Sequence, residues 1–243
     1  MYLPQNNSLT VIAGTSMALG LVVGLCLVFA VDCPAVAIFI TSICVYHLME
    51  FVQTARFQPS RVKTTSFLIW GNRGNREFMM VQLLSLWEYL WSHSRFAPHQ
   101  GYLPLHHPLA MVIGCLCIVS GQSLRSMAMA TCGESFSHLV ETTGNSSNRL
   151  VTTGVYSLTR HPSYLGFWLW VVGTQLVLGN HICLVAGLVA LHFFFSRRIS
   201  FEEWFLVNRI YGQPYVEYSE RVWVWIPFVW VRSTPRERPT RSR

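Results

Sequence analysis

Charged side chains are scarce in this chain. Asp, Glu, Lys and Arg account for 12% of its 243 residues, while hydrophobic residues account for 51%. Soluble domains carry about 25% charged residues, so the composition excludes an ordinary soluble domain and predicts an integral membrane protein. Because each transmembrane helix needs about 20 apolar residues, the chain has room for about six spans.

Motifs for metal binding and for disulfide frameworks are also missing. The 7 cysteines include no Cys-x-x-Cys pair, and most of them lie within apolar runs. Zinc sites and disulfide-rich folds have regular cysteine spacings. We therefore expect no metal ion, and we expect the cysteines to be small buried side chains.

The chain also lacks a soluble stretch in which basic residues alternate with aromatic ones, a pattern typical of nucleic-acid binding. Its net charge is nevertheless +7, from 18 basic and 11 acidic residues. The basic residues lie in loops between apolar runs and in the tail at residues 231–243. This distribution favours membrane orientation and attraction to anionic lipid. The expected partner is therefore the bilayer, and no nucleic acid.

The apolar runs predict an all-α, polytopic membrane fold with about six transmembrane helices. The last two runs are joined only by Gly179-Asn180-His181, which predicts a short C-terminal helical hairpin at residues 162–196. Its first arm spans about 26 Å at about 1.5 Å per residue, slightly less than a hydrocarbon core of about 30 Å. The predicted helices cover residues 9–31, 35–53, 78–91, 105–124, 162–178 and 182–196.

Basic loops orient this arrangement. The loop after the second helix and the loop after the fourth helix are rich in Arg and Lys, and the C-terminal tail is the most basic segment. The positive-inside rule then places both chain ends and residues 125–161 in the cytosol. We divide the chain into N-terminal transmembrane helices at residues 1–124, which would give a lipid substrate access, and a catalytic region at residues 125–243 with a cytosolic cofactor pocket, the hairpin and the tail.

Two acidic residues lie inside predicted helices, where charge is costly and needs a partner. Glu50 follows His47 by three residues and shares its helix face, and Glu88 lies in the short third run. We expect both carboxylates to form interhelical hydrogen bonds, with a functional role as the alternative.

Two polar segments flank the hairpin, at residues 135–164 and 197–227. A tight hairpin brings its two cytosolic ends together, so these segments should meet and form a site. Taken singly, their residues have simpler interpretations: Arg198 and Glu202 are spaced like an exposed helical ion pair, and Tyr164 could be an interfacial aromatic. The polar side chains that the segments bring together are His138, Glu141, Arg149, Tyr156, Arg160, His161, Arg198, Glu202, Glu203 and Tyr215.

As a set, these segments resemble the isoprenylcysteine carboxyl methyltransferase family. The motifs that carry the resemblance are Arg-His-Pro-x-Tyr-x-Gly from Arg160, Arg-Ile-x-x-Glu-Glu from Arg198, Gly-x-x-Tyr-x-x-Tyr from Gly212 and Ile-Pro-Phe from Ile226. The clear resemblance covers about residues 120–231. The N-terminal half fits the family more loosely.

The resemblance implies S-adenosylmethionine as methyl donor, with S-adenosylhomocysteine as product. It implies the C-terminal prenylcysteine of processed CaaX proteins, farnesylated or geranylgeranylated, as acceptor, and a multi-pass enzyme of the endoplasmic reticulum membrane whose site faces the cytosol. Arg198 and Glu202 would be the catalytic residues, with Arg198 binding the substrate carboxylate. The implied cofactor-binding residues are Glu141, Asn148, Arg149, Leu150, Val151, Tyr156, His161, Pro162, Ser163, Tyr164 and Glu202.

The chain departs from the family pattern at two places. Glu141 stands where familiar members have Gln, and the spacing from Glu203 to Gly212 is one residue longer. Because of the first departure, the resemblance does not define how Glu141 contacts the cofactor. Because of the second, it assigns no roles to the positions after Glu203.

The chemistry is consistent with the residues even without the resemblance. An α-carboxyl group has a pKa of about 3.3–3.7 and is ionised at neutral pH, so methylating it needs geometry, water exclusion and a cation, but no general base. The alternatives are an NADPH-dependent membrane sterol reductase, a lipid or amine methyltransferase of the same membrane superfamily, and a non-enzymatic scaffold or transporter. The Arg198–Glu202–Glu203 stretch is unexplained by the reductase, and the polar concentration on one side is unexplained by the scaffold.

Overall fold

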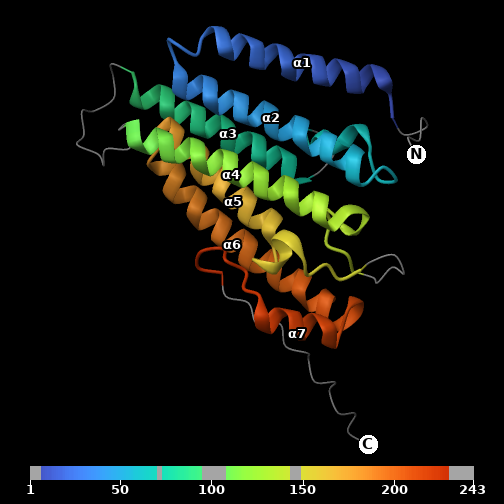
Figure 1. The fold of residues 1–243 in the computed structure, drawn as a ribbon. Helices are drawn as coiled ribbons and strands as arrows, with labels where there is room; N and C mark the ends of the chain where they lie inside the picture. Colours follow the sequence, from blue (N-terminus) through green and yellow to red (C-terminus); the bar gives the residue numbers. More distant parts are fainter. Residues whose placement is uncertain (1–6, 70–72, 95–107, 143–148, 230–243) are drawn as a thin grey trace, which may run out of the picture.

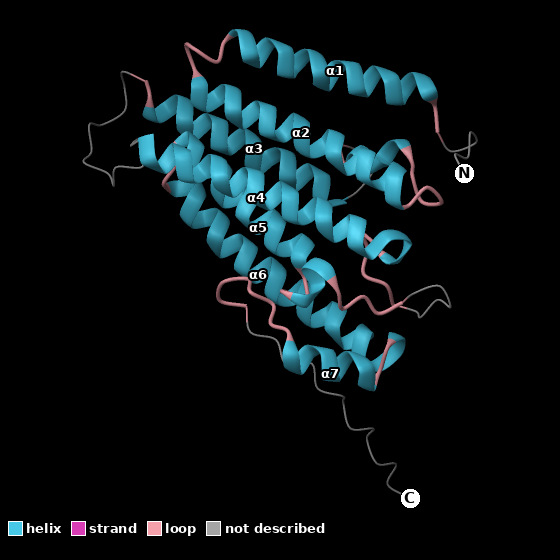
Figure 2. Ribbon diagram, viewed as in Figure 1, coloured by secondary structure: helices cyan, strands magenta, loops and turns pink. Residues whose placement is uncertain are grey.

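A computed structural model describes residues 7–69, 73–94, 108–142 and 149–229, and every regular element within these ranges is a helix (Figure 2). The seven α-helices are α1 (Leu9–Val28), α2 (Pro34–Phe57), α3 (Arg73–Ser92), α4 (Pro108–Cys132), α5 (Pro162–Leu178), α6 (Ile182–Phe205) and α7 (Gln213–Arg221). Short 3₁₀ turns are η2 (Thr64–Phe67), η3 (Gly133–Ser135) and η4 (Gly154–Ser157), and η5 (Leu206–Ile210) is a π-helical segment.

Helices occupy all six positions at which apolar runs predict them. Four stretches are long and apolar enough to cross a membrane by length and composition, namely Leu9–Val28, Pro34–Phe57, Pro108–Ser135 and Ile182–Ile210. Helix α5 has 17 residues and α3 has a weaker apolar character, so neither joins that set. The all-α membrane fold is confirmed, and a count of six spans remains a prediction.

The predicted end of the last helix is wrong. The first charged residues after the apolar run suggested an end at position 196, but α6 continues to Phe205 and then through η5. Arg and Glu have high helix propensity, and no Gly or Pro interrupts the chain before Gly212. Arg198 and Glu202 therefore lie on the end of a long helix instead of on a separate polar segment.

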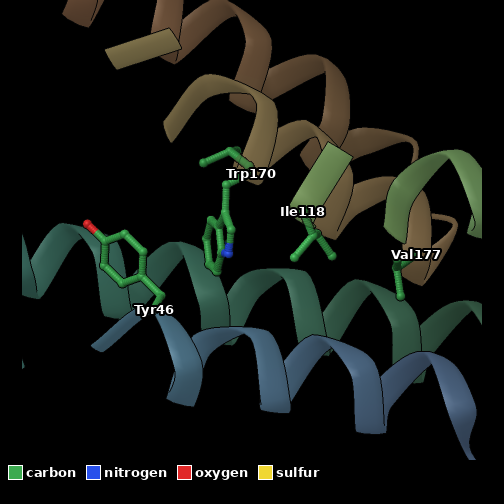
Figure 3. Packing of buried hydrophobic residues seen from close by; sticks show 5 residues of the cluster. Tyr46, Ile118, Trp170 and Val177 are labelled. Atoms are coloured by element: carbon green, nitrogen blue, oxygen red, sulfur yellow. The ribbon is translucent and has the colours of Figure 1, made fainter. Parts of the chain in front are cut away.

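Helix α1 lies at one side of the bundle, along α2, and α7 lies at the opposite side, near the end of α6 (Figure 1). Most side chains of α1 are exposed, and Cys26 is its one buried residue. An apolar helix with an exposed surface is what a helix facing lipid requires. Between these sides, Tyr46, Ile118, Trp170 and Val177 join α2, α4 and α5 in a buried core (Figure 3).

Both acidic residues inside helices have the interhelical bonds expected of them. The Glu50 carboxylate of α2 forms a buried ion pair with Arg125 of α4. The Glu88 carboxylate of α3 accepts hydrogen bonds from the backbone N–H groups of His181, Ile182 and Cys183, at 2.7 to 2.8 Å. An anion at the N-terminus of α6 satisfies N–H groups that have no partner within the helix. Glu88 thus stabilises the turn of the hairpin.

Helices α4 and α5 approach each other through paired glycines. A Cβ atom built on Gly121 would lie 2.5 Å from the carbonyl oxygen of Gly166, and one built on Gly173 would lie 2.6 Å from that of Gly114. In each helix the two glycines are seven residues apart. The two antiparallel helices therefore meet along a row of paired glycines, the glycine seam. Small residues at such contacts let helix backbones pack closely where lipid supplies no hydrophobic driving force.

Alanine in this seam should destabilise the protein. We expect Gly121→Ala to lower the melting temperature in detergent, because the new methyl group forces α4 and α5 apart at a cost of about 1–3 kcal/mol. Gly20→Ala is the matched control, since a Cβ at that position of α1 meets nothing within 4 Å. Equal melting temperatures for the two variants would show that the close approach of α4 and α5 contributes nothing to stability.

Candidate active site

A polar cavity lies at the end of the bundle where α4 and α6 end and α5 begins. It has a volume of about 120 Å³ and is partly open to solvent. Segments on both sides of the hairpin surround it, as predicted from the meeting of the hairpin's two ends. Predicted site residues that line the cavity are Arg149, Leu150, Val151, Tyr156, His161, Pro162, Ser163, Tyr164 and Glu202.

Two predicted site residues lie outside the cavity lining, and a third is not among the described residues. The Glu141 carboxylate lies outside the cavity lining and accepts a hydrogen bond from Arg61 Nη1 at 3.1 Å, which holds residues 136–141 against the loop after α2. Arg198 lies just outside the cavity and contacts it through Tyr164. Asn148 lies outside the described residues. A contact of Glu141 with a ligand in this cavity is therefore not supported.

Arg198 and Glu202 both form hydrogen bonds to the hydroxyl of Tyr164, which lies between them. Arg198 Nε donates a hydrogen bond to the Tyr164 hydroxyl at 3.1 Å, and this hydroxyl donates to Glu202 Oε2 at 2.5 Å. The guanidinium also lies over the Tyr164 ring, 5.9 Å from its centroid. The three side chains form a hydrogen-bonded row from the cavity to the outside of α6. The simple helical ion pair is thus not the arrangement adopted.

The Arg-His-Pro stretch joins the start of α5 to α6 through a buried carboxylate. Glu203, whose side chain is 2% exposed, lies 3.3 Å from Arg160 Nε and 3.1 Å from His161 Nε2. Pro162 occupies the first helical turn, where its missing N–H is not needed. The His161 ring stacks on Tyr164 with an interplanar angle of 5°. The stretch therefore sets the position of Tyr164 beside the cavity.

Glu203 has a different task from its neighbour Glu202. Successive residues of an α-helix point about 100° apart, so one carboxylate enters the cavity lining while the other enters the core. Glu203 is one of the polar residues that the two segments supply, but it is not among the predicted site residues. Two adjacent Glu residues in the motif indicate that one face of α6 points to the cavity and another points to the core.

Besides Tyr164, the cavity is lined by four tyrosines, Tyr156, Tyr211, Tyr215 and Tyr218. Burial raises the pKa of each phenol, to about 12 for Tyr211 and to higher values for Tyr156, Tyr215 and Tyr218. All four side chains are therefore neutral at physiological pH. They offer aromatic faces and hydroxyl groups to a ligand, and no negative charge.

Of these four, the sequence analysis assigned only Tyr156 to the site. Tyr215 and Tyr218 belong to the Gly-x-x-Tyr-x-x-Tyr motif, whose spacing of three puts both rings on one face of α7. Tyr218 donates its hydroxyl proton to the backbone carbonyl of Tyr156 at 2.6 Å, and Tyr211 donates to that of Arg149 at 3.1 Å. These bonds close the cavity between α7 and residues 149–156.

The stretch between Glu203 and Gly212, for which the resemblance predicts one additional residue, contains the π-helical segment η5. In a π turn the bonded residues are five apart instead of four, so such a segment accommodates one more residue without ending the helix. Backbone N–H groups of Tyr211 and Gly212 both point to the carbonyl of Leu206, at 2.8 and 3.3 Å. Leu206 and Tyr211 both line the cavity. The π-helical segment thus forms part of the cavity wall just before α7.

Comparisons with known proteins agree with this architecture. Residues 112–208 match the model of the isoprenylcysteine carboxyl methyltransferase (ICMT) family. A protein-S-isoprenylcysteine O-methyltransferase of Saccharomyces cerevisiae is 38% identical over 231 residues, which cover 93% of this chain and 94% of that protein. One of Schizosaccharomyces pombe is 37% identical over 226 residues, covering 88% of this chain and 93% of that protein.

A solved structure extends the similarity to three dimensions. The structure of the eukaryotic intramembrane Ras methyltransferase ICMT superposes with a TM-score of 0.81 at 32% sequence identity, covering 90% of this chain and 77% of that one. Identity at this level over most of the chain includes the N-terminal helices, which the motifs alone matched only loosely. The chain therefore belongs to the isoprenylcysteine carboxyl methyltransferase family.

Proposed function

We propose that this protein transfers the methyl group of S-adenosylmethionine to the C-terminal α-carboxylate of prenylated cysteine in processed CaaX proteins, giving a methyl ester. The observation that carries the proposal is the row Glu202–Tyr164–Arg198, which leads from a polar cavity to an arginine on the outer side of α6. The names of the relatives supply the reaction, and the row supplies the groups that this reaction needs. A sterol reductase has no support among the relatives.

The residues around the cavity suit S-adenosylmethionine. The Glu202 carboxylate can offset the positive charge of a sulfonium or ammonium group, and the neutral tyrosines can pack on an adenine ring. Arg149 offers a cation for the carboxylate of the same molecule. The cavity volume of about 120 Å³ is below the 300–1,000 Å³ of typical ligand pockets, so part of the molecule would lie outside the cavity. When bound, the donor supplies an electrophilic methyl group on sulfur.

Arg198 is placed to hold the acceptor. It lines a shallow groove on α6 whose other walls include the exposed side chains of Phe193, Phe194 and Phe201. A prenyl chain can occupy such an apolar groove from the bilayer, while the guanidinium binds the carboxylate through two parallel N–H groups. The carboxylate oxygen forms the new bond to the methyl carbon as the carbon–sulfur bond breaks. The electron pair of the broken bond goes to sulfur. No proton moves, so the chain needs no general base.

The charge distribution supports a membrane orientation. Basic residues that follow α2 and α4 lie at the end of the bundle that holds the cavity, and the turns at positions 29–33 and 179–181 at the other end contain no Lys or Arg. We therefore place the cavity in the cytosol and the protein in the endoplasmic reticulum membrane, with α3 and α5 completing six spans.

The acceptor can be tested with small molecules. We expect N-acetyl-S-farnesylcysteine to be methylated, and we expect its C-terminal amide and its non-prenylated analogue to be inert. The amide keeps the lipid, but it lacks the anionic nucleophile and the partner of Arg198. The measurement follows labelled methyl into a base-labile ester. Label in an amine or a phospholipid headgroup, with farnesylcysteine unchanged, would instead identify a lipid or amine methyltransferase.

Two substitutions should separate the donor and acceptor sides. Arg198→Lys should lower kcat/KM for the acceptor by about 10- to 100-fold, because an ammonium cannot replace two parallel charged hydrogen bonds, while the Kd of S-adenosylhomocysteine stays near wild type. Glu202→Gln should weaken S-adenosylmethionine more than S-adenosylhomocysteine, because only the former carries a sulfonium charge. Arg209→Lys, an exposed conservative change outside the cavity lining, is the control. Wild-type turnover in Arg198→Lys would remove Arg198 from the site.

Membrane orientation can be tested by cysteine labelling in sealed vesicles. Cys33 is exposed in the turn between α1 and α2 and should react with an impermeant maleimide only from the lumenal side. A cysteine introduced as Ser60→Cys, in the loop after α2, should react only from the cytosolic side. Labelling of both positions from the same side would contradict the proposed topology.

A further inference from the structure

We propose that Glu50, a buried carboxylate on α2, is a positioning residue for the acceptor-binding arginine Arg198. The inference rests on the proposed function, since it assigns to Glu50 the task of holding Arg198 in the orientation that binds a carboxylate. Glu50 lies outside the clear resemblance at residues 120–231, in the N-terminal half that fits the family more loosely. It acts through Arg125 and His138, which connect it to both halves of the site.

Glu50 is the centre of a buried hydrogen-bonded cluster. Its side chain is 1% exposed, and its two oxygens accept hydrogen bonds from three donors. Arg125 of α4 donates from Nε and Nη2 in a bidentate pair, and His138 donates from Nε2 at 2.8 Å. One carboxylate on α2 therefore ties together α4 and the segment that follows η3.

Each partner of Glu50 leads to the site by one further bond. Arg125 Nη1 donates to the hydroxyl of Ser163 at 2.6 Å, at the start of α5. The backbone carbonyl of His138 accepts a hydrogen bond from Arg198 Nη2 at 2.8 Å. The first branch reaches the cavity that suits the donor, and the second reaches the guanidinium that we assign to the acceptor.

The second branch determines how Arg198 can bind a carboxylate. A guanidinium has five N–H donors, and Arg198 uses two of them, one on Tyr164 and one on His138. These two bonds lie on Nε and Nη2, so they fix the plane of the group and leave both donors of Nη1 and one of Nη2 for a ligand. If His138 moves, the plane of the Arg198 guanidinium is no longer fixed. The free N–H groups of Arg198 can then approach the substrate carboxylate in several orientations.

Stability alone is a weak explanation for this cluster. A buried ion pair loses hydration on both partners, and well-packed apolar residues are often as stable or more so. Charged residues within membrane-spanning helices are usually tied to function. A purely structural ion pair between α2 and α4 would also not require His138, whose side chain is 24% exposed.

The test removes the link between Glu50 and Arg198 while leaving the Glu50–Arg125 ion pair intact. His138→Ala keeps the backbone carbonyl but deletes the imidazole that anchors it to Glu50. We expect the Kd of N-acetyl-S-farnesylcysteine, measured without turnover on protein saturated with S-adenosylhomocysteine, to rise about tenfold. The Kd of S-adenosylhomocysteine itself should change less than about twofold, and KM for the acceptor should change more than kcat. Leu139→Ala, the exposed neighbour, is the matched control.

Coupling to Arg198 provides the second measurement. Residues that act through one contact show non-additive effects, so His138→Ala should change acceptor binding little in an Arg198→Lys background. Glu50→Gln should weaken acceptor binding at least as much as His138→Ala, with Ser42→Ala as a control on the same helix, where the buried hydroxyl bonds only to the carbonyl of Phe39. If Glu50→Gln does not fold, the His138 and Arg198 variants still decide the question.

The outcomes separate this inference from the proposed function. Unchanged acceptor binding in His138→Ala, or fully additive effects with Arg198→Lys, would overturn the role of Glu50 and leave the methyltransferase assignment intact. Failure of the wild-type protein to bind or methylate the prenylcysteine would instead overturn the proposed function. Weaker acceptor binding in His138→Ala that disappears in the Arg198→Lys background supports both.

Discussion

The close contact of α4 with α5 is the constraint on which the site depends. At the Gly121–Gly166 crossing the backbones approach so closely that a Cβ on Gly166 would lie 2.9 Å from the backbone nitrogen of Arg125. Arg125 is thereby held against the first turn of α5, where its guanidinium reaches Ser163. A wider helix spacing would move the whole Arg-His-Pro stretch away from α4. The glycine seam thus sets the spacing between α4 and α5 that the hydrogen bond from Arg125 to Ser163 spans.

A second constraint comes from the extension of α6 beyond its apolar part. Because the helix continues to Phe205, Arg198, Glu202 and Glu203 are held at fixed angles around one axis. Glu203 enters the core and binds the start of α5, Glu202 enters the cavity wall, and Arg198 lies at the groove of exposed phenylalanines. A flexible loop could not divide three neighbouring charged residues among a core, a cavity and a groove of exposed phenylalanines.

The sequence predicts the parts of this structure that depend on local pattern. Apolar runs located the six long helices, and the short turn at residues 179–181 predicted the hairpin that brings the site together. The predicted end of α6 is wrong because Arg and Glu at positions 197–203 favour helix formation and do not end the helix. The bond of Glu141 to Arg61 has no signal in the local sequence, because Arg61 lies 80 residues earlier in the chain. The pairing of Glu50 with Arg125 needed the three-dimensional fold, because one sequence carries no signal for which distant helices touch.

The position of Arg198 follows from the different origins of the two proposed substrates. A prenyl chain gains about 0.8 kcal/mol for each buried CH₂ group, so the acceptor remains in the bilayer and its carboxylate can reach only to the membrane surface. A charged nucleoside donor comes from water and enters the polar cavity. A cation at the edge of the cavity, beside apolar side chains, can bind the acceptor carboxylate close to the donor. Such a cation must keep a fixed orientation beside the apolar side chains of the groove, and its bonds to Tyr164 and to the carbonyl of His138 provide that fixed frame.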